Sequence, residues 1–259
     1  MTGFLSRTIE GLFLSTDRQR YWSPEHFGLT GREILSPAPD GSRVSTLVID
    51  PAEGKPAGTV LYLHPGSHNR GFHLPQVAWL AAAGWRVLVP DYRGSGASEG
   101  SLRPDLLHED AEAAAAAADV RPGELIVFGQ GAGAHAALRF AARNPVLCRG
   151  LVLESLYATR RGWLIHRYGP GIGHLCAALL ESETPEPAEL LSRTGIPTAL
   201  LHAERDAWLP AAEHRALLRH IPANCTCWEA PGAKTSEPFM APGIWREKFL
   251  CFARSALAA

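Results

Sequence analysis

Short apolar runs alternate with longer stretches of helical character along most of this chain, and this alternation constrains the fold more than any other feature. It is the rhythm of βαβ units. We expect strands at residues 43–50, 58–64, 86–90, 125–129, 150–154, 198–203 and 226–230. We expect helices at residues 74–83, 106–119, 211–220 and 242–256, and an alanine-rich helix that ends near residue 143. Strands and helices in this order predict a mainly parallel sheet flanked by helices.

The chain is long enough for one large α/β domain, because it has 259 residues of which 46% are hydrophobic. No internal repeat or second core is evident, so we expect residues 1–259 to form a single domain. The regular pattern lapses between residues 156 and 193, where Gly, Pro and aromatic residues gather. An excursion of this length between two core strands predicts a small cap, at residues 157–193, over the carboxyl edge of the sheet.

Charge and cysteine content exclude some classes of function. The chain has 25 Lys and Arg against 26 Asp and Glu, without a basic stripe that would bind phosphates, so we expect no nucleic-acid partner. The cysteines are odd in number and lack the spacing of a metal site, which favours free thiols in a reducing compartment. They are Cys148, Cys176, Cys225, Cys227 and Cys251.

The N-terminal segment, residues 1–20, has an apolar periodicity suited to a short amphipathic helix. Arg7 and Glu10 interrupt it early, so the segment resembles neither a signal peptide nor a membrane span. We therefore expect no integral membrane segment and a cytoplasmic location.

Three segments at the ends of predicted strands carry the strongest functional signal. Residues 60–70 read VLYLHPGSHNR, residues 87–100 read VLVPDYRGSGASEG, and residues 127–138 read VFGQGAGAHAAL. In this order and spacing they resemble the α/β-hydrolase superfamily, in the branch that includes depalmitoylase, acyl-thioesterase and lysophospholipase-like serine hydrolases. The resemblance extends from about residue 42 to the C-terminus and is weakest in the cap. It implies an α/β-hydrolase fold, with a mostly parallel central sheet of about eight strands.

The nucleophile position departs from the family pattern. Family enzymes carry Gly-x-Ser-x-Gly at a strained strand-to-helix turn, the nucleophile elbow, which exposes a serine above the sheet. The same register here reads Gly129, Gln130, Gly131, Ala132 and Gly133. The flanking glycines remain, and Gly131 adopts the strained backbone more easily than serine does. The resemblance thus implies an intact elbow without its nucleophile.

The histidine position departs as well, whereas the acid position is retained. Asp206 follows a predicted strand in LLHAERDAWLP, where the family places the acid that orients the histidine; otherwise it is an ordinary turn aspartate. After the last predicted strand the chain reads APGAKTSEP, and Thr235 occupies the histidine position. Threonine does not ionise near neutral pH and cannot shuttle a proton. A shift of one residue would place Lys234 or Ser236 there, and neither is an imidazole.

The oxyanion hole is altered in part. The resemblance assigns its two backbone N–H donors to Gly66 and Ala132. Pro65 stands where the branch usually has glycine, and proline has no N–H group. This change reshapes the loop without removing the two named donors.

Relocated groups would replace the missing chemistry only if a serine lay next to a base. Ser67, Ser155 and Ser236 are all expected near the carboxyl edge of the sheet. The candidate bases are His68, His73 and His135. The simpler interpretation of His135 is a satisfied, partly buried helix residue.

Cofactor and metal sites are not expected. His64, His68 and His73 match the spacing of no standard metal site. No glycine-rich nucleotide fingerprint follows the first predicted strands in the required form.

The leading hypothesis from the sequence is a pseudoenzyme that keeps the pocket and binds a small-molecule or acyl-type ligand, or a protein partner. The alternative is a weak or unusual esterase or thioesterase that uses relocated residues. A serine replaced on purpose to trap a complex would explain Gly131 but not Thr235 as well. A serine oxygen within hydrogen-bonding reach of a histidine ring at this edge would contradict the leading hypothesis.

Overall fold

The computed structural model describes residues 14–179 and 185–258, and an eight-stranded sheet forms its centre. The strand order is β1-β2-β4-β3-β5-β6-β7-β8, with β2 antiparallel to both neighbours and all later pairs parallel. The strands are β1 (Gly31–Pro37), β2 (Arg43–Ile49), β3 (Thr59–Leu63), β4 (Arg86–Pro90), β5 (Leu125–Gln130), β6 (Cys148–Glu154), β7 (Thr198–Arg205) and β8 (Cys225–Lys234). The expected mostly parallel sheet is confirmed.

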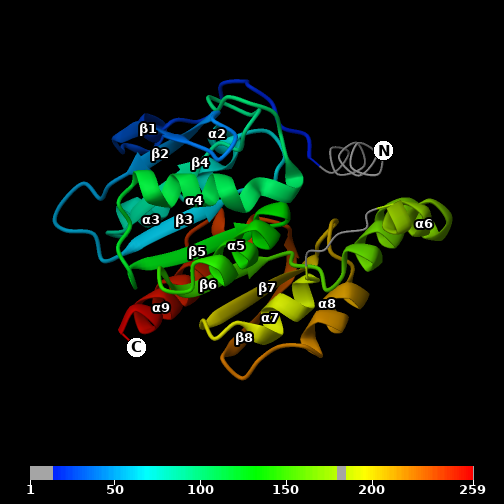
Figure 1. Ribbon diagram of the computed structural model, residues 1–259. Helices are drawn as coiled ribbons and strands as arrows, with labels where there is room; N and C mark the ends of the chain where they lie inside the picture. Colours follow the sequence, from blue (N-terminus) through cyan, green and yellow to red (C-terminus); the bar gives the residue numbers. More distant parts are fainter. Residues whose placement is uncertain (1–13, 180–184, 259) are drawn as a thin grey trace.

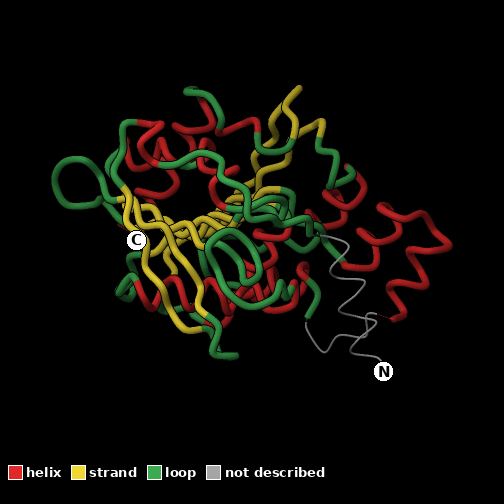
Figure 2. The backbone as a smooth tube through the Cα atoms, turned by 90° about the horizontal axis from the view of Figure 1, so that it is seen from above, coloured by secondary structure: helices red, strands yellow, loops and turns green. Residues whose placement is uncertain are grey.

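Helices cover both faces of the sheet and give the molecule three layers (Figures 1 and 2). The α-helices are α2 (Arg70–His73), α3 (Ala78–Ala82), α4 (Leu107–Ala117), α5 (Ala132–Arg143), α6 (Arg160–Leu179), α7 (Pro187–Arg193), α8 (Ala211–Leu218) and α9 (Ile244–Ala258). The 3-10 helices are η1 (Pro24–Phe27), η2 (Leu74–Gln76), η3 (Pro104–Leu106) and η4 (Glu237–Phe239). Within the described ranges, no helix is long and apolar enough to cross a lipid bilayer.

The central strand β3 shows why the apolar runs are continuous. Leu61 and Leu63 belong to the core that contains α4, α5, α7 and α8, whereas Val60 and Tyr62 belong to the core that contains α3 and α9. All four side chains are fully buried. A strand with two covered faces is apolar at successive positions, so it stands out in the sequence.

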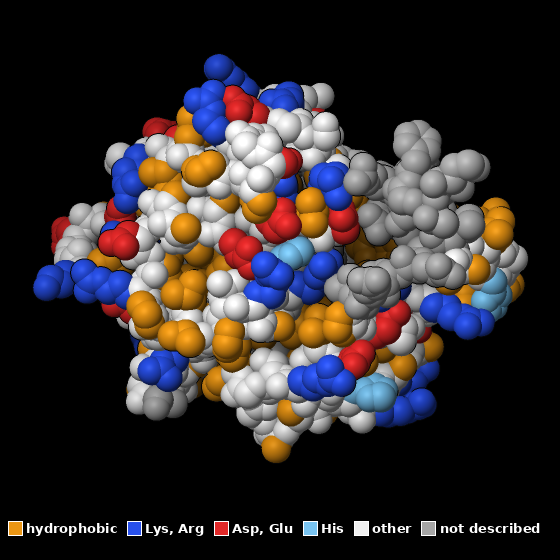
Figure 3. All heavy atoms as spheres, in the orientation of Figure 1, with side chains coloured by type: hydrophobic (Ala, Val, Ile, Leu, Met, Phe, Trp, Pro, Cys, Tyr) orange, Lys and Arg blue, Asp and Glu red, His pale blue; other side chains and the backbone are white. Residues whose placement is uncertain are grey.

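Charged side chains of both signs are interspersed on the face of the molecule in Figure 3. Lys and Arg do not gather into a stripe on that face. This distribution agrees with the balanced composition of the chain.

Two elements in the first half of the chain differ from the prediction. β1 is an antiparallel edge strand whose side chains are mostly exposed or half-buried, so no apolar run marks it. The helix expected at residues 74–83 is divided into η2 and α3, because Val77 has φ −132° and ψ −16°. The helix expected in the first 20 residues lies largely outside the described residues.

Between β6 and β7, where Gly and Pro interrupt the regular pattern, we expected a cap and assigned no helix to it. The segment holds α6 and α7. Gly169 has non-helical φ 76° and ψ 167°, and Pro170 follows it, so α6 consists of two helices joined at a kink. Figure 1 shows α6 extending away from the sheet.

The DYRGSGASEG segment ties neighbouring loops together through the side chain of Arg93, which is only 1% exposed. Its guanidinium contacts the carboxylates of Asp40, Glu109 and Asp110 at 2.9, 2.9 and 2.5 Å. This segment therefore has a structural role: it fixes the loop after β4 to α4 and to the turn between β1 and β2.

Candidate functional site

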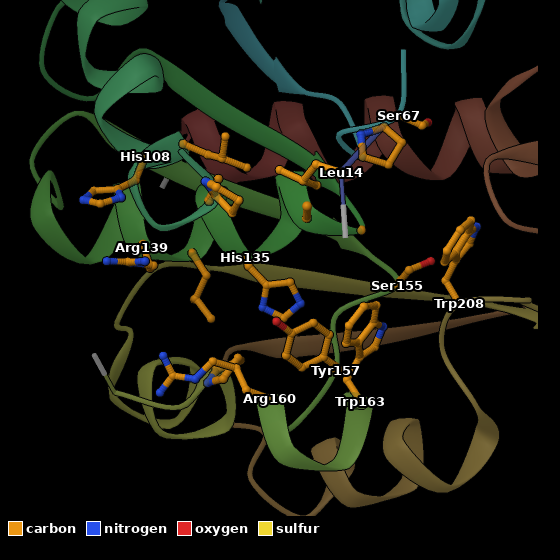
Figure 4. Close-up of a pocket in the computed structure, with 18 of the residues that line it drawn as sticks. Leu14, Ser67, His108, His135, Arg139, Ser155, Tyr157, Arg160, Trp163 and Trp208 are labelled. Carbon is orange, nitrogen blue, oxygen red and sulfur yellow. The ribbon is translucent and has the colours of Figure 1, made fainter. Parts of the chain in front are cut away.

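A cavity of about 410 Å³ opens at the carboxyl ends of the strands (Figure 4). The loops that follow five strands contribute to its wall, through Ser67, Gly131, Ser155, Trp208 and Thr235. Ligands of open α/β sheets bind at this edge. The cavity is therefore the candidate site.

The turn at the cavity floor has the geometry that the Gly-x-Gly-x-Gly sequence predicts. β5 ends at Gln130 and α5 begins at Ala132, so Gly131 alone makes the turn, with φ 54° and ψ −121°. A Cβ atom at Gly129 would overlap the carbonyl group of Gly133, and one at Gly133 would overlap the carbonyl oxygen of Leu63. Both flanking glycines are needed for close packing of the strand against the helix.

Gly131 presents no side chain to the cavity that it lines. A Cβ atom at this position would lie 3.1 Å from the Cβ atom of Pro65, closer than most such contacts. Pro65 thus crowds the position that a nucleophile would occupy.

Asp206 and Thr235 meet at this edge of the sheet. The Thr235 hydroxyl donates to Asp206 Oδ1 at 2.7 Å, and the Ser155 hydroxyl donates to Asp206 Oδ2. The backbone N–H groups of Trp208 and Leu209 donate to Oδ1 at 2.8 and 3.0 Å. Four donors therefore surround the Asp206 carboxylate, and none of them is an imidazole.

The contact that was expected to contradict the leading hypothesis is present in its distance: Ser67 Oγ lies 3.3 Å from His73 Nε2, within hydrogen-bonding reach. The position of the ring proton decides whether this contact can serve catalysis. The same Nε2 lies closer, at 2.8 Å, to the Ser67 carbonyl oxygen, which can only accept a hydrogen bond. Nδ1 of the ring lies 3.2 Å from the side-chain amide nitrogen of Gln76, a donor. Nε2 therefore carries the ring proton and cannot take a second one from Ser67, and burial lowers the pKa of His73 to about 4.

The two backbone donors assigned to the oxyanion hole lie on adjoining loops, because a Cβ atom at Gly66 would lie 3.5 Å from the Cβ atom of Ala132. The Gly66 N–H, however, donates to His64 Nδ1 at 3.3 Å. The side chain of Leu14 lies against Gly66, so that a Cβ atom added to Gly66 would overlap it. The backbone N–H of Ser15 donates to the Gly66 carbonyl oxygen at 3.0 Å. The Gly66 half of the hole is thus engaged by other groups.

The comparisons with known proteins agree with this fold. The profile of the family described as serine aminopeptidase, S33, matches residues 54–168. An esterase of Pyrococcus furiosus, Pf2001, superposes with a TM-score of 0.69 over 95% of this chain and 97% of its own, at 19% sequence identity. An esterase of Thermogutta terrifontis gives 0.66 over 88% and 99%, at 22% identity. This chain belongs to the α/β-hydrolase superfamily.

Among its sequence relatives, this α/β hydrolase is similar to the uncharacterized protein YfhR of Escherichia coli K12. The two are 30% identical over 198 residues, which is 73% of this chain and 65% of YfhR. Protein bem46 of Schizosaccharomyces pombe is 24% identical over 207 residues, 76% of this chain and 68% of its own. The matched region thus spans slightly less than two thirds of YfhR.

One buried acid near the site, Glu154 at the end of β6, was not predicted from the sequence. Its Oε1 accepts from the backbone N–H of Ser236 at 2.6 Å, and its Oε2 accepts from the side-chain amide of Gln130. Gln130 in turn accepts from the Tyr62 hydroxyl. Burial, with a contribution from the Asp206 charge, raises the pKa of Glu154 to about 7. A glutamate at the end of an apolar run was the available signal.

The hydrogen bonding of His135 differs from the prediction of a satisfied helix residue. Its Nε2 is buried and has no hydrogen-bond partner among the described residues, so the side chain is not satisfied as predicted. Its ring packs on Tyr157, with centroids 3.6 Å apart, on the cavity wall (Figure 4). Burial lowers the pKa of His135 to about 3, so the imidazole is neutral.

Proposed function

We propose that this α/β hydrolase is a pseudoenzyme that binds a small, largely apolar ligand in the cavity at Gly131. The hydrogen bond from Thr235 to Asp206 carries the proposal, because a hydroxyl takes the place at the acid that an imidazole takes in a triad. Gly131, on the same cavity, has no nucleophilic atom. An acid without a histidine to orient, beside an elbow without a serine, has no triad chemistry to perform.

The expected loss of activity is large. Removing a triad serine or histidine from a well-studied protease lowers turnover by roughly a millionfold, about 8 kcal/mol of activation free energy. The losses are not additive, so two absent groups cost little more than one. Substrate binding and the oxyanion donors alone give roughly 10³–10⁴ over water. We expect less here, because the Gly66 N–H donates to His64.

The cavity wall supports an apolar ligand with one hydrogen-bonding group. Leu138, Leu164 and Trp163 are among its apolar lining residues. His135 Nε2 is buried, and no described residue bonds to it, so it is the polar atom that a ligand would satisfy. An acyl chain that ends in a carboxyl or amide group has both features.

In this proposal residues 157–193 act as the cap of a single domain and hold the ligand from one side. Tyr157 and Trp163 line the cavity from this segment, and their rings stack with centroids 5.7 Å apart. The alternative to a small ligand in this proposal is a protein partner that docks on the cap. The five free cysteines support a reducing, cytoplasmic location.

A weak esterase or thioesterase is the second candidate, and the contact between Ser67 and His73 favours it. Esterases among the structural neighbours agree with it. It requires the His73 ring to leave the Ser67 carbonyl oxygen and to accept a proton at Nε2.

Fluorophosphonate labelling, combined with hydrolysis of short-chain nitrophenyl esters, separates the two candidates. A pseudoenzyme shows no saturable labelling of any serine and hydrolyses the esters no faster than its Ser67→Ala variant. Ser192→Ala, which removes an exposed hydroxyl on α7, is the matched control. Saturable labelling that is lost in Ser67→Ala and kept in Ser192→Ala would establish the esterase instead.

A further inference from the structure

Three side chains that can bind a metal ion meet outside the cavity, and we call them the His-His-Glu cluster. His202 lies on β7, Glu229 is its register partner on β8, and His214 lies on α8. One potential ligand atom from each residue lies within 4.8 Å of the other two. None of the three lines the cavity, so the cluster is separate from the candidate site.

The Glu229 carboxylate already holds the cluster together. Its Oε2 lies 3.2 Å from His202 Nδ1, and its Oε1 lies 2.8 Å from His214 Nε2. The two imidazole rings stack, with centroids 4.1 Å apart and an interplanar angle of 11°. Both histidines are buried, whereas the Glu229 side chain is 57% exposed. The cluster is therefore open to solvent on the carboxylate side.

The charges of the cluster favour a cation. His214 Nε2 donates a hydrogen bond to the Glu229 carboxylate, so a metal ion would bind this nitrogen after it releases its proton. Burial opposes ionisation of Glu229, but hydrogen bonds to His214 and His202 outweigh it and lower the pKa of the carboxyl group. In the part of the chain that the structure describes, no Lys or Arg pairs with Glu229. A negative charge thus lies beside two nitrogen donors without a fixed positive partner.

We propose that His202, His214 and Glu229 bind a divalent transition-metal ion, for which Zn²⁺ is the best match. Two imidazoles and one carboxylate form a known zinc ligand set, with water in the fourth position. Zinc bonds of about 2.0–2.1 Å place tetrahedral ligand atoms roughly 3.4 Å apart. The two imidazole nitrogens lie 3.2 and 2.8 Å from different oxygens of the carboxylate, and one ligand atom from each residue lies within 4.8 Å of the other two, so modest side-chain shifts would bring the three around one ion. Metal binding would release the protons that these two nitrogens donate to Glu229, which leaves a lone pair on each.

A metal ion here would fasten both ends of the loop at residues 206–210. His202 precedes this loop on β7, and His214 follows it on α8. The loop presents Trp208 to the cavity and carries Asp206, whose charge acts on the His214 ring. The ion would thereby hold one wall of the cavity in place without touching the ligand.

The test titrates chelator-treated, tag-free, full-length protein with Zn²⁺ by calorimetry and with Co²⁺ by visible absorption. We expect one equivalent of each ion to bind, with the d–d absorption of four- or five-coordinate Co²⁺. Glu229→Gln, at an exposed position, should weaken binding at least about tenfold and remove the absorption band. His220→Gln, an exposed histidine just beyond α8, should change neither result.

Equal affinity for Zn²⁺ in the wild-type protein, Glu229→Gln and His220→Gln would overturn the proposal. Absence of stoichiometric binding to the wild-type protein would do so as well, and would mean that the cluster is a hydrogen-bonded group only. His214→Gln is a second ligand variant, but it changes a buried residue. Circular dichroism verifies that each variant folds. If His214→Gln does not fold, the affinity of the exposed variant Glu229→Gln for Zn²⁺ tests the proposal on its own.

Discussion

At position 131 the backbone adopts φ 54° and ψ −121°, a conformation that strains every residue except glycine. Gly129 and Gly133 are glycines for a different reason, because a Cβ atom at either would overlap the neighbouring backbone. The fold of the elbow therefore needs no side chain at Gly131, whereas hydrolysis does. This difference explains how the turn persists without a nucleophile.

Alanine substitutions should separate these two requirements. Gly131→Ala introduces backbone strain and a contact with Pro65, so we expect it to lower the free energy of unfolding by about 1–3 kcal/mol. Gly133→Ala should cost more, because its Cβ atom meets the Leu63 carbonyl oxygen, which the sheet holds in place. Urea denaturation measures both values. A larger loss in Gly131→Ala than in Gly133→Ala would contradict this reading of the elbow.

The Glu154 carboxyl group should make stability depend on pH. Burial raises its pKa from the ordinary 4.5 to about 7. Between these two values the folded chain keeps a proton that the unfolded chain releases. The free energy of unfolding should therefore fall as pH rises through this window, by on the order of 3 kcal/mol.

Glu154→Gln tests this dependence, because an amide does not titrate. Urea denaturation at several pH values from about 4.5 to 7.5 should give a flatter profile for the variant than for the wild-type protein. Superimposable slopes would show that Glu154 titrates normally in the folded protein.

At the scale of elements, the sequence predicted the buried strands well and the exposed or broken elements poorly. β4 lies at Arg86–Pro90, the residues predicted, because both of its faces are covered. β1 was missed because an edge strand with few buried residues has no apolar run. α6 was missed because Gly169 and Pro170, which mark a kink within it, also mark loops.

The same distinction applies to the site. Gly131, Asp206 and Thr235 could be proposed from the sequence because each lies within a few residues after a predicted strand. The buried bonds of Glu154 and the His-His-Glu cluster depend on which strands are neighbours. No single sequence states that pairing, so these groups became visible only in the structure.

The ion pairs of Arg93 connect elements, and their loss should be costly. Arg93→Met would leave the buried Asp110 carboxylate without its partner, so we expect a loss of about 3–5 kcal/mol in the free energy of unfolding. Arg103→Met is the control, because Arg103 pairs with Asp105 at a partly exposed position and should cost less than about 1 kcal/mol. Guanidinium denaturation measures the free energy of unfolding of both variants. Equal losses in the two variants would contradict this prediction.

At the scale of the whole molecule, the three layers bring the loops after five strands to one edge of the sheet (Figure 2). The fold thus sets Gly131 and Thr235 on the cavity wall and Asp206 behind Thr235, to which it is hydrogen-bonded. In our proposal two side chains separate this scaffold from a complete triad, together with the space that Pro65 takes from the elbow.

Nitrophenyl ester hydrolysis by a restored triad tests that claim most directly. The variant combines Gly131→Ser, Thr235→His and Pro65→Gly, and its control carries the last two changes alone. We predict that Gly131→Ser raises the rate at least about 100-fold over the control and over the wild-type protein. Equal rates in all three proteins would contradict the account, as would a wild-type rate as high as that of the restored variant.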